Sequence, residues 1–111
     1  MASLIHFVGY TLAAGVTDEK IARVRDGFAA LTDAVDGAEL VCIGPNVSRS
    51  AFARDWQYAA VVRLRDPAVL AAYIAHPVHD ALGIETRDGF YDRCAVLDIE
   101  TPDGPDPDVA R

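Results

Sequence analysis

The chain has 111 residues, of which 51% are hydrophobic and 24% are charged. This length fits one domain with one core, since domains of about 100 to 150 residues are the commonest size. The formal net charge of -7 disfavours binding to nucleic acid or anionic lipid, and no apolar run reaches the roughly 20 residues that cross a bilayer.

The first half of the chain predicts a strand, a helix and a second strand. Residues Leu4 to Leu12 alternate between two largely apolar faces, as in a strand covered on both sides. Thr17 is a good N-cap for a helix that ends at Asp36-Gly37. A short apolar run from Leu40 to Ile43 is expected to be the second strand. The apolar positions of the helix recur every three or four residues and are Ile21, Val24, Phe28, Leu31 and Val35.

The second half predicts a strand, a helix with a break, and a last strand. Residues Trp56 to Leu64 alternate as a strand, and Asp66-Pro67 supplies an N-cap and an N1 proline for the following helix. Pro77 is expected to end or bend this helix before a second short helical stretch. Residues Tyr91 to Ile99 form the last predicted strand. The order β-α-β-β-α-β is that of the α+β ferredoxin-like fold, in which helices cover one face of a four-stranded antiparallel sheet.

Such a sheet leaves its second face uncovered. If the helices cover the side that carries His6, Tyr58 and Val96, the bare face still carries apolar side chains, namely Ile5, Phe7, Val61 and Leu97. Burying several hundred square ångströms of apolar surface contributes many kcal/mol at about 25 cal/mol per Å². We therefore expect a symmetric homodimer, with a second subunit facing the open sheet.

The cysteines, the histidines and the C-terminal residues give three further expectations. Cys42 and Cys94 lie in apolar strand-like runs without CxxC spacing or a secretory signal, so we expect buried, reduced thiols and a cytoplasmic protein rather than a disulfide. The histidines lack the companion motifs of zinc proteins, so we expect no metal. Residues 1–101 are expected to form the domain and residues 102–111, rich in proline and aspartate, a disordered tail.

One segment gathers groups that can transfer protons. The string Tyr73-Ile74-Ala75-His76-Pro77-Val78-His79 contains two of the three histidines and one of the four tyrosines. Histidine titrates near neutrality, and a nearby tyrosine can donate a hydrogen bond or a proton. Together with Ile5-His6-Phe7-Val8 and the helix after Gly15-Val16-Thr17, this string resembles the stress-responsive dimeric α/β-barrel (Dabb) family over residues 3 to 101.

The resemblance implies a fold, an assembly and a class of activity. Members of this family form a barrel from two four-stranded sheets, and characterised relatives include a plant polyketide cyclase, which catalyses a cofactor-free intramolecular aldol condensation, and fern hydroxynitrile lyases. The catalytic pair of the cyclase falls on Tyr73 and His79, and its strand histidine falls on His6. Tyr58 stands where the cyclase has a further histidine, so the pocket and its substrate are expected to differ.

The residues themselves suit such chemistry without a cofactor. His79 can remove a proton next to a carbonyl while Tyr73 donates a hydrogen bond to its oxygen. Asp98, isolated among apolar strand residues, can accept the other ring N–H of His79. Each also has a structural alternative, since His79 can satisfy a backbone carbonyl and Tyr73 can serve as packing. The expected pocket lining is His6, Val8, Tyr10, Phe28, Tyr58, Ala60, His76 and Val96, although His76 also suits a helix cap.

These residues support three functional hypotheses. The first is a cofactor-independent cyclase or carbon-carbon lyase acting on a small apolar molecule that contains a carbonyl group. The second is a non-catalytic dimer that binds a small apolar ligand during stress. The third is a cofactor-free monooxygenase of the related antibiotic-biosynthesis group, against which the Tyr-x-x-His-Pro-x-His string argues.

Overall fold

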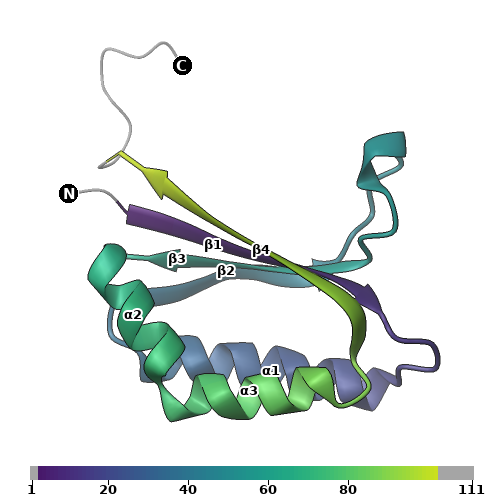
Figure 1. Ribbon diagram of the computed structural model, residues 1–111, viewed down its shortest axis with the longest axis horizontal. Helices are drawn as coiled ribbons and strands as arrows, with labels where there is room; N and C mark the ends of the chain where they lie inside the picture. Colours follow the sequence, from purple (N-terminus) through teal and green to yellow (C-terminus); the bar gives the residue numbers. More distant parts are fainter. Residues whose placement is uncertain (1–2, 103–111) are drawn as a thin grey trace.

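A single antiparallel sheet carries the α-helices α1, α2 and α3 on one of its faces (Figure 1). The computed structural model describes residues 3–102. Its elements in chain order are β1 (Ser3–Leu12), α1 (Asp18–Ala34), β2 (Ala38–Pro45), the 3-10 helix η1 (Ala51–Ala53), β3 (Tyr58–Leu64), α2 (Pro67–Ala75), α3 (Pro77–Arg87) and β4 (Tyr91–Thr101). The ferredoxin-like fold predicted from the sequence is confirmed, with the second helical region divided into α2 and α3.

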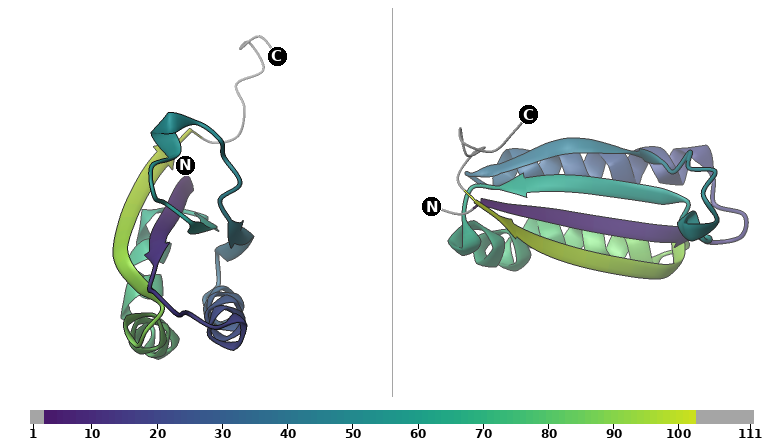
Figure 2. Two further views of the ribbon diagram at one scale, coloured as in Figure 1. Left: turned by 90° about the vertical axis from the view of Figure 1, so that its right-hand side faces the viewer. Right: turned by 90° about the horizontal axis from the view of Figure 1, so that it is seen from above.

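The sheet has the order β2-β3-β1-β4, so the first strand lies inside the sheet and the last strand lies at an edge. Figure 2 shows α1 beneath the half of the sheet that contains β2 and β3, and α3 beneath the half that contains β1 and β4. The register pairs His6 with Val62 on one side and with Asp98 on the other. Residues far apart in the sequence therefore meet side by side on the face that the helices cover.

The local signals in the sequence explain where the helices begin. The Thr17 side chain accepts a hydrogen bond from the Lys20 amide at 3.1 Å, and the Asp66 carboxylate accepts one from the Val69 amide at 3.1 Å. Between sheet and helices lies the core, whose most deeply buried large side chains are Val24, Leu31, Val62, Leu64, Tyr73 and Phe90. None of the helices within residues 3–102 has the length and apolar character of a membrane span.

The other face of the sheet is apolar and uncovered in the single chain. Leu97 and Ile99 of β4 are 56% and 51% exposed, and Phe7 and Val61 beside them are half-buried. The register places Val61, Phe7 and Leu97 in one row across three strands. The residues expected on the bare face from alternation alone therefore do lie there. The tail expected to be disordered falls almost wholly at residues 103–111, outside the described residues.

The expectation that both cysteines are buried is wrong for the single chain. Cys42 and Cys94 are both exposed and unpaired within residues 3–102. The register of β2 against β3 shifts between Leu40 and Cys42, so that Cys42 pairs with Val61. Cys42 therefore lies on the same uncovered face as Val61. Cys94 points toward the helices, but it belongs to the edge strand β4 and borders a cavity instead of the core. An apolar run fixes neither which face is covered nor which strand is at the edge.

Gly37, in the turn between α1 and β2, provides a test of this packing. Its φ is +90°, and a Cβ there would lie 2.9 Å from Cγ2 of Val69 on α2. Gly37→Ala should destabilise the protein by about 2 to 4 kcal/mol, because backbone strain of about 1 to 2 kcal/mol adds to the clash. Urea denaturation measures the change in unfolding free energy. Gly15→Ala is the control, since Gly15 has φ +77° but open space around its Cβ. An equal loss in the two variants would show that the Val69 contact is unimportant.

Candidate functional site

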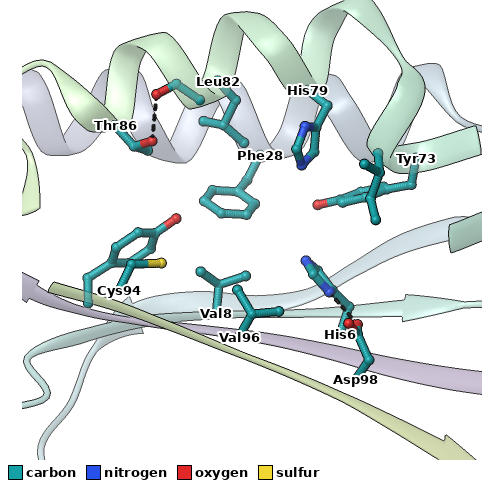
Figure 3. Close-up of a pocket in the computed structure, with 13 residues that line it drawn as sticks. His6, Val8, Phe28, Tyr73, His79, Leu82, Thr86, Cys94, Val96 and Asp98 are labelled. Carbon is teal, nitrogen blue, oxygen red and sulfur yellow. Dashed lines mark hydrogen bonds and ion pairs between the residues drawn. The ribbon is translucent and has the colours of Figure 1, made fainter. Parts of the chain in front are cut away.

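A cavity of about 280 Å³ lies between β1 and β4 on one side and α3 on the other (Figure 3). Its walls come from both sequence halves: strand residues from β1 and β4, Phe28 from α1, and side chains of α2 and α3. The lining residues are His6, Val8, Tyr10, Phe28, Tyr73, Ile74, His79, Leu82, Gly83, Thr86, Cys94, Val96 and Asp98. Val96 points toward the helices yet remains 52% exposed, so the cavity is open beside the edge strand.

The break between α2 and α3 places two of these residues. His76 ends α2, and its Nδ1 accepts a hydrogen bond from the Val78 amide at 3.1 Å, which caps α3. Pro77 takes the first position of α3, where the missing N–H costs nothing. Tyr73 therefore lies in the last turn of α2 and His79 in the first turn of α3, and both line the cavity. His76 itself does not line it and acts as a cap.

The Tyr73 hydroxyl lies between two imidazole rings. The ring centroid of Tyr73 is 5.3 Å from that of His6 and 5.6 Å from that of His79, both in edge-to-face geometry. Within residues 3–102, the Tyr73 hydroxyl is the buried side-chain group that has no hydrogen-bond partner. Figure 3 shows this hydroxyl and the nitrogen-bearing edges of His6 and His79 directed toward one another. A buried unpaired hydroxyl costs about 1 to 3 kcal/mol, which a ligand oxygen can recover.

Asp98 contacts His6 and not the expected His79. Oδ1 of Asp98 lies 2.6 Å from Nδ1 of His6, which is buried. The two residues are direct cross-strand partners on β1 and β4, so the sheet register brings them together. In the neutral ring, Nδ1–H donates this hydrogen bond to the carboxylate, and Nε2 carries the lone pair on the far side of the ring. The predicted Asp98–His79 pair is thus corrected to an Asp98–His6 pair.

Burial shifts the pKa values of His79 and Tyr73. It lowers the pKa of His79 from 6.5, with the nearby Asp80 charge opposing and His6 assisting the shift. A neutral imidazole is therefore favoured at pH 7. Burial raises the pKa of Tyr73 well above its ordinary value of 10, and the Asp98 charge adds to this effect. The site thus pairs a neutral base with a phenol that keeps its proton.

Most of the predicted lining residues meet in this cavity. Tyr58 and Ala60 do not, because β3 lies over α1, and His76 does not, because it caps α3. The structure adds residues that the sequence analysis missed, namely Ile74, Leu82, Gly83, Thr86 and Cys94. The spacing of His79, Leu82, Gly83 and Thr86 on one helix face was the available signal. Among the described residues, no group of three or more histidine, cysteine or acidic side chains is arranged to hold a metal.

The sequence matches the model of the stress-responsive A/B barrel domain, Dabb, over residues 4–101. The chain belongs to this family. No curated protein matches it.

Several solved structures share the Dabb fold of this chain. An Arabidopsis thaliana protein is 22% identical with a TM-score of 0.80, and the alignment covers 93% of this chain and 98% of that one. A hydroxynitrile lyase from Passiflora edulis is 12% identical with a TM-score of 0.77, and the alignment covers 94% of this chain and 97% of that one. A dimeric ferredoxin-like protein of unknown function from Thermobifida fusca is 17% identical with a TM-score of 0.75, and the alignment covers 90% of this chain and 92% of that one. At these identities the likeness concerns the fold.

The Asp98–His6 contact predicts which nitrogen of His6 carries the proton. In the wild type, His6 should populate the Nδ1–H tautomer, because the Asp98 carboxylate can only accept. In Asp98→Asn, an amide can donate to Nδ1, so the population should move toward the Nε2–H tautomer. Two-dimensional ¹⁵N–¹H spectra of the imidazole rings at pH 8 distinguish the two. Glu100→Gln, on the same strand outside the cavity, is the control. An unchanged His6 tautomer in Asp98→Asn would contradict the assignment.

Proposed function

We propose that the protein is a cofactor-independent acid-base catalyst that acts on a carbonyl-containing small molecule, as a polyketide-type cyclase or a carbon-carbon lyase. The supporting observation is the unpaired, buried hydroxyl of Tyr73, which lies between the rings of His6 and His79 at the edge of a cavity. A ligand carbonyl oxygen at this position would accept its hydrogen bond. The same oxygen gains negative charge when a neighbouring carbon loses a proton.

In this proposal, His79 is the base and Tyr73 the hydrogen-bond donor. The neutral imidazole of His79 takes a proton from the carbon beside the carbonyl, and the electron pair of the broken C–H bond forms an enolate. Tyr73 donates a hydrogen bond to the enolate oxygen. The enolate carbon then attacks a second carbonyl of the same molecule, and the imidazolium of His79 returns the proton to the new alkoxide. The reverse sequence cleaves a carbon-carbon bond.

His6 would be a second, oriented imidazole in this reaction. Its Nδ1 is held by Asp98 at 2.6 Å, so its Nε2 can accept a hydrogen bond from a substrate hydroxyl. Asp98 is then a positioning residue and His6 a binding residue. The Passiflora edulis hydroxynitrile lyase has the same fold, which supports the proposal in so far as the fold can accommodate lyase chemistry.

Binding without catalysis is the second candidate, favoured by the apolar part of the cavity. Val8, Phe28 and Leu82 are buried and line it, as does Val96. These side chains would hold a small apolar molecule whether or not His79 removes a proton. Loss of the His79 imidazole therefore distinguishes the two functions. It should abolish turnover if the protein is a catalyst, and it should change nothing if the protein only binds its ligand.

Hydrogen-deuterium exchange next to a carbonyl tests the proposed base directly. The probe is 4-phenyl-2-butanone in deuterium oxide, followed by proton NMR. The wild type should accelerate exchange over buffer, and His79→Ala should lose about 10²- to 10⁴-fold of that acceleration. Tyr73→Phe should lose about 10²- to 10³-fold because the enolate oxygen loses its donor. Since burial lowers the pKa of His79 from 6.5, the wild-type rate should fall on acidification and reach half of its plateau only at a pH below 6.5.

The matched control replaces the histidine that caps α3. His76→Asn keeps a side-chain acceptor at the cap, because asparagine is a favoured N-cap residue, and should leave the exchange rate unchanged. Probe affinity measured by titration calorimetry accompanies each rate. Equal exchange in the wild type and His79→Ala, with the probe bound in both, would contradict the catalytic proposal and favour the binding function.

We further propose that two copies pair through the uncovered face of the sheet. The described chain exposes Leu97 and Ile99 beside the half-buried Phe7, and single chains seldom leave so much contiguous apolar surface in water. Structural neighbours from Thermobifida fusca and Bacteroides fragilis are described as dimeric, which supports the same arrangement here. A face shared by two copies gives a closed, isologous assembly.

A charge on the uncovered face should separate the two copies. The wild type should show twice the chain mass by light scattering coupled to size-exclusion chromatography, and Leu97→Glu should show the single mass at micromolar concentration. The reason is that a buried carboxylate without a partner costs several kcal/mol. Ile84→Glu is the control, because Ile84 is 64% exposed on α3, away from the sheet. A wild type of single mass, or a dimeric Leu97→Glu, would contradict this interface.

A further inference from the structure

The cavity has polar groups at both of its ends. We propose that it recognises an elongated, uncharged carbonyl compound whose second polar group, a hydroxyl, contacts Tyr10 at the end remote from His79. This inference rests on the proposed function, since it assigns the carbonyl of the ligand to Tyr73. It adds the class of molecule and names Tyr10 as the residue that selects it.

The polar groups repeat along each of the three elements that form the cavity walls. On β1 they are His6 and Tyr10, on β4 their cross-strand partners Asp98 and Cys94, and on α3 His79 and Thr86. Four residues along a strand span about 13 Å, and seven along a helix span about 10 Å. Figure 3 shows Cys94 and Thr86 together at the end opposite to His6, His79 and Tyr73. The elements thus form a trough with two polar ends about 10 Å or more apart.

The middle of the trough is apolar. Val8 of β1 and Val96 of β4 are cross-strand partners on its floor, and Leu82 of α3 and Phe28 of α1 lie opposite them (Figure 3). None of these four side chains has a hydrogen-bond donor or acceptor that could pair with a polar group of a ligand. A ligand that reaches both ends therefore needs an apolar linking segment, such as an aromatic ring, between its polar groups.

The remote end offers neutral hydrogen-bonding groups. Burial raises the pKa of the Tyr10 hydroxyl far above 10 and raises the pKa of the Cys94 thiol, so both keep their protons at pH 7. The Thr86 hydroxyl donates to the Gly83 carbonyl at 3.1 Å, which leaves its oxygen free to accept. The carboxylate that lines the cavity, Asp98, belongs to the other end. A donor and an acceptor at the same end of the cavity suit a hydroxyl group, and none of the residues that line this end has a charged side chain.

Two ketones that differ by one hydroxyl test this assignment. The probes are 4-phenyl-2-butanone and 4-(4-hydroxyphenyl)-2-butanone, whose dissociation constants are measured by titration calorimetry at pH 7. The wild type should bind the hydroxylated ketone about five- to tenfold more tightly, as expected for one additional hydrogen bond. Tyr10→Phe should bring the ratio close to one and leave the affinity for the plain ketone unchanged. Tyr91→Phe is the control, because Tyr91 packs against Tyr10 at 5.5 Å between ring centroids but does not line the cavity.

The outcomes separate this inference from the catalytic proposal. Equal affinities of the wild type for the two ketones, a preference that survives in Tyr10→Phe, or no binding of either ketone would overturn the inference. A preference that disappears in Tyr10→Phe and persists in Tyr91→Phe would support it. The same titration in His79→Ala should keep the preference, because that variant changes only the other end of the trough. A negative exchange test would therefore not change the interpretation of the Tyr10 titrations, and negative Tyr10 titrations would not change the interpretation of the exchange test.

Discussion

The break between α2 and α3 is the constraint on which the site depends. In one continuous helix, Tyr73 and His79 would point about 120° apart, since successive residues turn by about 100°. Pro77 cannot donate to a preceding carbonyl, and His76 leaves helical geometry with ψ of 138° while its ring caps the new helix. The chain therefore restarts in a new direction, and both side chains turn toward the sheet. A backbone interruption of one residue creates the juxtaposition of phenol and imidazole.

The same juxtaposition leaves a polar group without a partner in the core. Tyr73 is 1% exposed, and its ring packs between His6 and His79. The ring contributes apolar burial to the core, whereas its unpaired hydroxyl opposes folding by about 1 to 3 kcal/mol. Phenylalanine at this position would pack as well without that cost. The stability of the fold therefore does not account for the hydroxyl, whereas the proposed contact with a ligand oxygen would.

Local patterns predicted the elements well because their causes are local. Alternation separated the residues of β1 into its two faces, and Thr17 and Asp66 marked the starts of α1 and α2 through their own side-chain hydrogen bonds. The partner of Asp98 could not be predicted in this way, because it depends on the register of β1 against β4. Tyr58 is buried on the expected face, but its strand β3 lies over α1 and Tyr58 does not line the cavity. Alternation therefore predicted the direction of this side chain but not its neighbours.

The edge strand β4 joins the two surfaces on which function would depend. Its alternate residues point to opposite faces, so Asp98 borders the cavity while Leu97 and Ile99 lie on the uncovered apolar face. As an edge strand, β4 is held by β1 alone and its free edge can move more readily than an inner strand. A second copy packed on the uncovered face would restrain β4 and with it the carboxylate that orients His6. Formation of the dimer would then stabilise the geometry of the cavity, even if the second copy contributes no residue to its lining.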